Sequence, residues 1–392
     1  MLRFFTAGES HGEALVGTIS GLPAGISVEQ GFVDRELWRR QQGYGRGGRM
    51  KIESDRAHFL SGVRHGKTIG SPIAIVLENK DWKNWQEALP VEAGDPAKHK
   101  TVKSPRPGHA DLAGALKYDF PDARYVLERA SARESAARVA CGALAKLFLR
   151  ELGIEVLSHV VAVGGATIAN ADVTWESLVA LAKKDEVLLN CADAESEQRM
   201  KAEVDAVLKT GDTVGGVFEV VAHNVPPGLG TYAQWDERLD TQLAAAVMSL
   251  QAVKAVEIGS GVTSAVSQGS AVHDAIGYEK QKQRFTGFVR SSNNAGGIEG
   301  GVTNGEDVLV RGYLKPISTL RRPLESVDFA TREPVKAAYE RSDVCVVPAA
   351  GVAGEAMVAL TLARAALEKF GGDSIGETKR NFQGYLGQLK DF

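Results

Sequence analysis

The sequence of 392 residues contains only three cysteines, Cys141, Cys191 and Cys345. They are odd in number and far apart, and no two have the short spacing that metal ligands share. Isolated thiols of this kind predict a reducing, cytoplasmic compartment, with neither a disulfide framework nor a metal site. The N-terminus lacks the apolar run of a signal peptide, and we expect no later segment to be long and apolar enough to cross a bilayer. A secreted or membrane protein is therefore not expected.

Internal repeats, low-complexity tracts and breaks in composition are missing as well. We therefore expect one domain over residues 1–392, which at this length is able to bury a large core. The strands and helices that the sequence predicts lack the regular alternation of a doubly wound parallel sheet. The sequence thus favours an α+β fold in which antiparallel sheets pack on helices.

Apolar spacing and turn signals place the elements of that fold. We predict helices at about 33–40, 131–152, 174–184, 194–209, 235–253 and 352–369, and strands at 71–78, 154–160, 216–223, 255–259, 307–314 and 344–347. Ser131 and Glu134 have the spacing of a capping box at the start of the second helix. The polar segment 80–104 is predicted to be a long surface loop, and loops of this length are usually functional or disordered.

Charge is unevenly distributed along the chain. The formal net charge is −3, yet residues 35–67 hold nine Lys and Arg against three acidic residues. A local positive field in an acidic protein favours a small anionic ligand over nucleic acid, which usually requires a broader basic face.

Three glycine-rich loops, at 8–12, 43–49 and 106–111, carry arginine or histidine. Glycine lets a backbone approach a ligand closely, and arginine pairs with carboxylate or phosphate in a fixed fork. Residues 43–48 match a dinucleotide fingerprint, but a predicted helix precedes them where a strand is required. Residues 62–68 resemble a phosphate-binding loop but are one residue short and lead into a strand. An arginine–glycine segment that binds RNA, or a solvated basic loop, remains an alternative for residues 46–48.

His11 and His109 are the strongest candidates for proton transfer. Both lie in glycine-containing turns, and Glu9 and Asp111 are close enough in sequence to orient their rings. An imidazole titrates near neutral pH and is suited to general acid catalysis. The other histidines that we considered, at 58, 99, 159 and 273, are expected to be ordinary surface or core residues.

Three further motifs point to anion binding and to a base. The glycine run 296–301 suits close approach to a planar or phosphorylated ligand, but a turn-rich hairpin explains it nearly as well. Residues 315–319 offer one cation and two hydroxyls at the end of a strand, as a phosphate clamp would. Arg341 and Asp343 place an anion-binding group beside a carboxylate base.

Seven blocks of this sequence, taken in order, resemble the chorismate synthase family. The resemblance runs from residue 1 to at least 369, and Ala130 is one departure, since many members carry serine there. The blocks are Gly8-Glu9-Ser10-His11-Gly12, Gly43-Tyr44-Gly45-Arg46-Gly47, Arg106-Pro107-Gly108-His109-Ala110-Asp111, Arg129-Ala130-Ser131-Ala132-Arg133-Glu134, Asn294-Ala295-Gly296-Gly297, Lys315-Pro316-Ile317-Ser318-Thr319 and Arg341-Ser342-Asp343.

The resemblance implies the last step of the shikimate pathway. In that step 5-enolpyruvylshikimate-3-phosphate loses phosphate and a ring proton by anti-1,4 elimination and becomes chorismate. It also implies reduced FMN without net redox change, a homotetramer, and a β-α-β sandwich. NADPH, or an external flavin reductase, would supply the reduced flavin.

The resemblance further implies a role for individual residues. His11 would protonate the departing phosphate, His109 would lie protonated near flavin N1, and Asp343 would act with flavin N5 in removing the ring proton. Arg40 and Arg46 would bind either substrate or NADPH, and the sequence does not separate these roles. The substrate-binding set is Arg40, Arg46, Arg49, Arg106, Arg133 and Arg341, and the FMN-binding set is Arg129, Ala130, Ser131, Gln251, Ala252, Gly300, Lys315, Pro316, Ile317, Ser318, Thr319 and Arg341.

Two readings compete with this one. A flavin-dependent isomerase of a phosphorylated substrate would also need reduced FMN and arginines, but not this pair of loop histidines. A protein that only binds an anion or RNA would be indifferent to mutation of His11.

Overall fold

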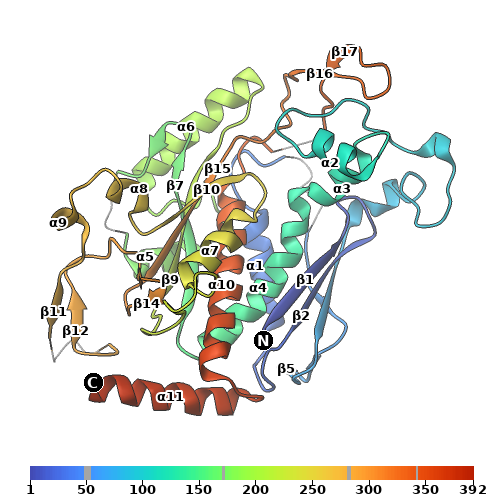
Figure 1. Cartoon of the computed structure of the whole chain (residues 1–392). Coiled ribbons are helices and arrows are strands. Elements are labelled where there is room, and N and C mark those ends of the chain that lie inside the picture. The colour runs from blue at the N-terminus through green and yellow to red at the C-terminus, as the bar shows by residue number, and fades with distance from the viewer. Residues whose placement is uncertain (48–53, 170–172, 280–283, 341–342) are drawn as a thin grey trace.

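The computed structural model describes residues 1–47, 54–169, 173–279, 284–340 and 343–392 (Figure 1). Two antiparallel sheets carry most of the strand residues. The first has the order β1-β2-β6-β3, formed by Arg3–Gly8, Ala14–Ser20, Ile73–Glu78 and His58–Phe59. The second has the order β10-β15-β9-β7-β8, formed by Val253–Ile258, Val308–Leu314, Gly216–His223, Glu155–Val163 and Ala166–Thr167. The predicted α+β class with antiparallel sheets is confirmed.

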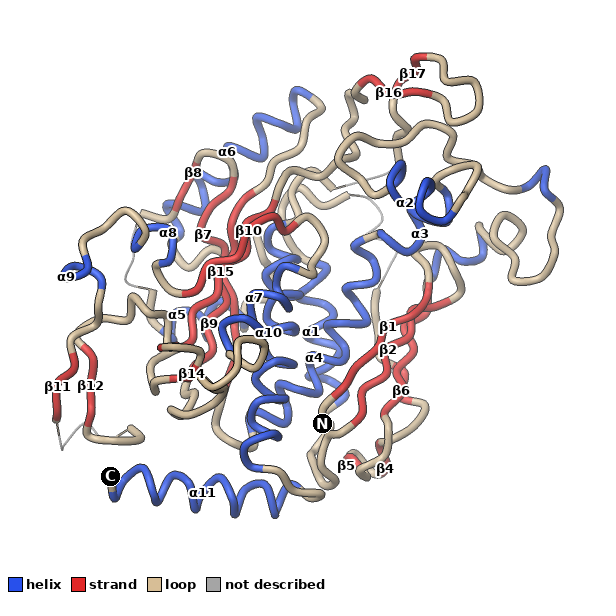
Figure 2. The backbone as a smooth tube through the Cα atoms, viewed as in Figure 1, coloured by secondary structure: helices blue, strands red, loops and turns tan. Residues whose placement is uncertain are grey.

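Helices α1 (Gln30–Gln41), α4 (Ser135–Arg150) and α10 (Val347–Phe370) form the centre of the molecule (Figure 2). Helix α4 packs on β2 and β6 of the first sheet, whereas α10 packs on β7 and β9 of the second. The two helices also pack on each other, so closely that a Cβ added at Gly142 would lie 2.3 Å from the Ala356 Cβ. Glycine at this position allows the backbones of α4 and α10 to approach.

Helix α10 corrects our expectation about membrane spans. Its 24 residues are long and apolar enough to cross a bilayer by length and composition, but 83% of its apolar window is buried inside the protein. A helix that is apolar on all sides is typical of a core position. Here it lies between α4 and the second sheet, which explains its composition.

The remaining elements surround these layers. The helices are α2 (Asp111–Tyr118), α3 (Arg124–Ala130), α5 (Trp175–Ala182), α6 (Ala194–Thr210), α7 (Leu239–Met248), α8 (Gly261–Ser264), α9 (Gly269–Val272) and α11 (Ile375–Asp391), with 3-10 turns at Lys80–Asn84, Pro96–Lys98 and Ala132–Glu134. The small hairpins are β4–β5 (Val63–Arg64, Lys67–Thr68), β11–β12 (Ile276–Tyr278, Phe288–Arg290), β13–β14 (Ile298–Glu299, Val302–Thr303) and β16–β17 (Glu325–Val327, Pro334–Lys336). Segment 80–104 is a long loop apart from its two 3-10 turns, as predicted.

Four local predictions are wrong in whole or in part. Residues 344–347 are no strand; they lead into α10, whose first turn contains Pro348. Ser131 caps the 3-10 turn before α4, and Glu134 makes no capping box because its carboxylate binds Thr6, Gln251 and Arg138 instead. The alternation of residues 154–160 predicts a half-buried strand, but β7 is buried on both faces over most of its length, since α10 covers one face and α5 packs against the strand as well. The predicted helix 235–253 is also shorter, because it begins only at Leu239.

Candidate active site

The loop 8–12 lies against α3, at the end of the molecule where α4 begins (Figure 1). The His11 Nδ1 lies 2.9 Å from Glu128 Oε1, and the His11 backbone N–H donates to Glu128 Oε2 at 2.7 Å. Our expectation that Glu9 orients this ring is therefore wrong, and Glu128 from α3 does so. Burial acts to raise the pKa of Glu128, but the hydrogen bonds and charge of His11 hold this pKa below its usual value.

An indole ring lies against the other side of this histidine. The Trp85 and His11 ring centroids are 4.0 Å apart with an interplanar angle of 25°. Trp85 comes from the long loop 80–104 and is itself buried. The loop that the sequence marked as functional or disordered is thus ordered here and forms one wall of the His11 site.

A buried ion cluster, formed by Arg40, Arg133 and Asp55, is connected through Asn79 to the His11 turn. Arg133 Nη1 lies 2.7 Å from both carboxylate oxygens of Asp55, and Arg40 Nη1 lies 3.5 Å from Asp55 Oδ2. Arg133 Nε also donates to Asn79 Oδ1, while the Asn79 amide donates to the backbone oxygens of Glu9 and Gly12. Asn79 therefore connects the His11 turn to the arginine cluster.

Arg46 and Asp343 add a second ion pair to the cluster. Arg46 Nη1 lies 2.8 Å from Asp343 Oδ2, and the Gly47 backbone N–H donates to Asp343 Oδ1. Burial lowers the pKa of Arg40 to about 10; Asp55 and Asp343 oppose this, whereas the charges of Arg133 and Arg46 add to it. Three guanidinium groups face two carboxylates in this cluster, so the local charge favours a bound anion.

His109, Asp111 and Arg106 form a separate network in the third glycine loop. His109 Nδ1 is hydrogen-bonded to Asp111, as the sequence predicted, and Arg106 Nε donates to Asp111 Oδ2 at 2.8 Å. Arg106 Nη1 also donates to Thr319 Oγ1 at 2.9 Å. Burial acts to raise the pKa of Asp111, but hydrogen bonds from His109 and Arg106 hold this pKa well below its usual range. Arg106 thus braces the loop against segment 315–319.

The structure links most of the predicted FMN-binding residues by short contacts. Arg129 donates to the backbone oxygens of Thr6 and Gly8, and Ser131 Oγ accepts from Ser10 Oγ at 3.1 Å. Gln251 donates to Glu134, which also accepts from Thr6. These contacts gather β1, the end of α3 and the loop after α7 at one place.

Segment 315–319 continues this line of contacts. The Lys315 backbone N–H donates to Ala252 O at 3.0 Å, and Lys315 Nζ donates to Gly108 O. Thr213 Oγ1 donates to Ile317 O at 2.7 Å, which holds the middle of the segment against the residues just before β9. Pro316 and Ser318 complete the segment, and Ala130 is the last residue of α3.

Gly300 lies elsewhere in the chain. It occupies the turn of the β13–β14 hairpin with φ of +59°, and Leu239 N donates to the neighbouring Gly301 O. The glycine run 296–301 thus forms the hairpin that we considered, and Figure 1 shows it well away from α3. Arg49 and Arg341 lie outside the described residues, although Glu340 just before Arg341 accepts from Arg124 at 2.9 Å.

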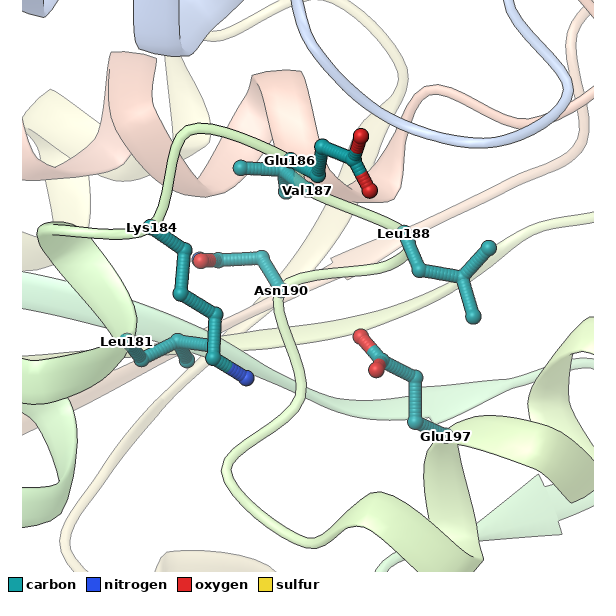
Figure 3. A pocket seen from close by; sticks show the side chains of 7 residues that line it. All are labelled: Leu181, Lys184, Glu186, Val187, Leu188, Asn190 and Glu197. Carbon is teal, nitrogen blue, oxygen red and sulfur yellow. The ribbon is translucent and has the colours of Figure 1, made fainter.

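Two cavities lie outside these networks. The first is lined by Leu181, Lys184, Glu186, Val187, Leu188, Asn190 and Glu197 (Figure 3). Its wall meets the second glycine loop, since Tyr44 N donates to Leu188 O. Glu197 accepts from the backbone of Leu189 and Cys191, so its carboxylate already serves the wall. The second cavity is lined by Ile258, Gly261, Ser264, Val272, His273, Asp274, Ile276, Asn294, Ala295 and Glu299.

Sequence reasoning missed Glu128, Asn79, Asp55 and Trp85. Each acts through a partner that is distant in sequence; His11 and Glu128, for example, are 117 positions apart. A single Asn after a strand, or a Glu inside a short helix, has no local signature of its own. Only the position of Trp85 in a long loop could have drawn attention to it.

Comparisons with known proteins agree with this arrangement. A profile of the chorismate synthase family matches residues 2–367. The chain is 74% identical over 393 residues to the chorismate synthase of Koribacter versatilis and 71% identical over 394 residues to that of Acidobacterium capsulatum, with 100% of both chains covered in each case. A crystal structure of chorismate synthase aligns with a TM-score of 0.79 and 41% identity, covering 100% of this chain and 99% of the other. The chain belongs to the chorismate synthase family.

Proposed function

We propose that the chain converts 5-enolpyruvylshikimate-3-phosphate into chorismate by anti-1,4 elimination of phosphate. Family membership makes the chain a lyase of aromatic amino acid biosynthesis. The observation that carries the proposal is the connected cluster of His11, Asn79, Arg133 and Arg40. It supports the proposal because His11, the proposed proton donor, lies near a buried excess of positive charge.

The arginines would bind the anionic groups of the substrate, which carries two carboxylates and a phosphate. The buried Arg40 Nη1 makes no hydrogen bond to the described residues, and its ion-pair partner Asp55 Oδ2 lies 3.5 Å away. A buried donor without a partner is costly, and a ligand anion would satisfy it. Each well-formed charge-assisted bond contributes about 1.5–3 kcal/mol. Arg46 and Arg133 would complete this set, together with Arg49 and Arg341.

His11 would give its proton to the departing phosphate, and Asp343 would accept the ring proton. His11 is held by Glu128 and Trp85, so its ring has a fixed direction. Asp343 would move away from Arg46 or share it with substrate as the proton arrives. The two groups act on opposite ends of the 1,4 elimination.

The predicted FMN site fits the chemistry of a flavin. It offers the Lys315 cation, the hydroxyls of Ser131 and Ser318, the Gln251 amide, and a histidine held by a carboxylate. Bound reduced FMN would supply transient electron density that helps phosphate leave. His109 would present a protonated ring to the flavin, since Asp111 stabilises that charge. Arg106 would then position the loop of His109 rather than contact substrate directly.

Several features of the family are proposed for this chain as well. The packing of two sheets on α4 and α10 supports a β-α-β sandwich, and one apolar cluster from Leu2 to Phe382 supports a single domain. We further propose a cytoplasmic homotetramer. If the chain reduces its own flavin, NADPH would bind through Arg40 and Arg46. Otherwise an external reductase would supply the reduced FMN.

Anaerobic turnover with chemically reduced FMN tests the proposal. Chorismate is followed by ultraviolet absorbance and phosphate release in parallel, and equal yields of both products are expected. The same assay with His11→Asn and His109→Asn should lose most turnover while folding is kept. Folded, flavin-binding protein that releases no product would contradict the proposal and favour a flavin-dependent isomerase.

A further inference from the structure

Glu128 contacts both the ring and the backbone of His11. One carboxylate oxygen lies 2.9 Å from the ring Nδ1, and the other accepts from the backbone N–H of the same residue at 2.7 Å. The ring and the main chain of His11 are therefore fixed together. The side chain of Glu128 is only 2% exposed, so water competes little for either bond.

We propose that Glu128 is the positioning residue of His11 and that Arg124 connects Glu128 to Glu340. A carboxylate at Nδ1 keeps a proton on that nitrogen and thus assigns the transferable proton to Nε2. This inference rests on the proposed proton transfer from His11 to the leaving phosphate.

Arg124 forms the next link in the same buried chain of charges. Its Nη1 lies 3.3 Å from Glu128 Oε1, and its Nη2 donates to Glu340 Oε1 at 2.9 Å. Arg124 Nε also donates to the backbone oxygen of Lys100 at 2.6 Å. One guanidinium therefore joins α3, the end of the long loop and the residue three positions before Asp343.

Trp85 restrains the imidazole from a second direction. Its ring stacks on His11, and Lys100 Nζ lies 3.9 Å from the Trp85 ring centroid. Because Lys100 and Arg124 both contact this region, the loop 80–104 and α3 hold the histidine jointly. Glu128 sets the nitrogen that carries the transferable proton, whereas Trp85 sets the plane of the ring.

The chain offers a matched control for a test of this role. Glu219 is also buried, binds His159 Nε2 at 3.2 Å and accepts from Arg311 at 2.6 Å. It thus repeats the His–Glu–Arg arrangement on strands of the second sheet, away from the proposed site. Glu128→Gln and Glu219→Gln each remove a buried carboxylate from a His–Glu–Arg trio, so any difference in turnover between the two variants reports on His11.

We expect Glu128→Gln to lower kcat about 10- to 100-fold, as removal of a partner that orients a functional imidazole does. The KM for substrate should change less than about two-fold, because Glu128 contacts no proposed substrate group. In a His11→Asn background the same change should cost less than about two-fold, since the partner is gone. Glu219→Gln should keep wild-type turnover. Glu128→Asp, which retains the charge with a shorter reach, should lie between.

Nitrogen NMR of histidine-labelled protein gives a second measurement that does not depend on turnover. The His11 signal, assigned by its loss in His11→Asn, should report a proton on Nδ1 in the wild type and a changed proton distribution in Glu128→Gln. Wild-type turnover in Glu128→Gln, or an unchanged His11 spectrum, would overturn the positioning role. If the wild type itself shows no turnover, the proposed function is refuted. The NMR spectrum of His11 would then still decide whether Glu128 fixes the position of the ring proton.

Discussion

Arg40→Met is expected to stabilise the ligand-free protein while it weakens substrate binding. Burial lowers the pKa of Arg40 from its usual value to about 10 in the folded chain. A base whose pKa is lower in the folded state carries its charge at a cost to stability, and that cost is complete at every pH below about 10. The difference corresponds to about 3 kcal/mol against the folded state.

The bonds that Arg40 makes offset only part of this cost. Its Nε donates to Ser135 Oγ at 2.9 Å and its Nη2 to Ala132 O at 3.2 Å, and such bonds contribute about 1 kcal/mol each. Neither acceptor is stranded in the variant, because Ser135 Oγ itself donates to Ala132 O. Asp55 likewise keeps Arg133 at 2.7 Å. A net gain of about 1 kcal/mol in the free energy of unfolding follows.

Urea unfolding at fixed protein concentration, with and without substrate, measures both effects. Loss of one charge-assisted contact should weaken substrate binding about 10- to 100-fold. The neighbouring Arg39 is the control, since it binds Glu36 and Glu355 in the core and its pKa is raised, chiefly by Glu355, against the effect of burial. Arg39→Met should destabilise by about 3–5 kcal/mol because it strands buried carboxylates. If Arg40→Met destabilises the ligand-free protein as Arg39→Met does, the reasoning about crowded charge fails.

Four other outcomes are expected. Among the described residues, Lys146→Met leaves Arg39 as the one cation paired with the buried carboxylates of Glu36 and Glu355, so urea unfolding should show a loss of about 3–5 kcal/mol. Burial acts to raise the pKa of Glu36, but Lys146 and Arg39 lower it from 4.5 to about 2. The ionised carboxylate therefore contributes about 3 kcal/mol to the free energy of unfolding; this contribution is complete above pH 4.5 and is lost as the pH falls towards 2. Acid unfolding of Glu36→Gln should lack this component. Gly142→Ala should cost about 1–3 kcal/mol in thermal unfolding because of the Ala356 contact, whereas Gly384→Ala in α11, with open space at its Cβ, should not destabilise. Asp343→Asn retains an acceptor for Gly47 N but removes the proposed base, so turnover should fall with folding intact; wild-type turnover would refute that role.

The sequence predicted the periodic parts of the fold well, for physical reasons. Helices α5 and α6 and strands β6, β9 and β15 have clear apolar spacing and end near the predicted residues. The failures occur where tertiary contacts decide. Glu134 has the spacing of a capping residue, yet a buried carboxylate beside Gln251 and Arg138 gains more from those partners than from a backbone N–H. Residues 344–347 are apolar enough for a strand, but Pro348 suits the first turn of a helix.

The candidate site was predictable as a set of loops but not as a set of contacts. The pairing of His109 with Asp111 follows from their spacing of two residues, whereas that of His11 with Glu128 depends on how α3 lies against the loop 8–12. The same limit applies to Arg39 and Arg40. They are adjacent on α1, equally basic and equally buried. Arg39 faces Glu36, Lys146 and Glu355, a group with one net negative charge that the guanidinium neutralises, whereas Arg40 faces Asp55 and Arg133. A turn of 100° per residue separates a structural arginine from one that we propose to bind ligand, and nothing in the two-residue sequence records which is which. Their opposite pKa shifts do record it, and that is why stability measured on this pair distinguishes the site from the core.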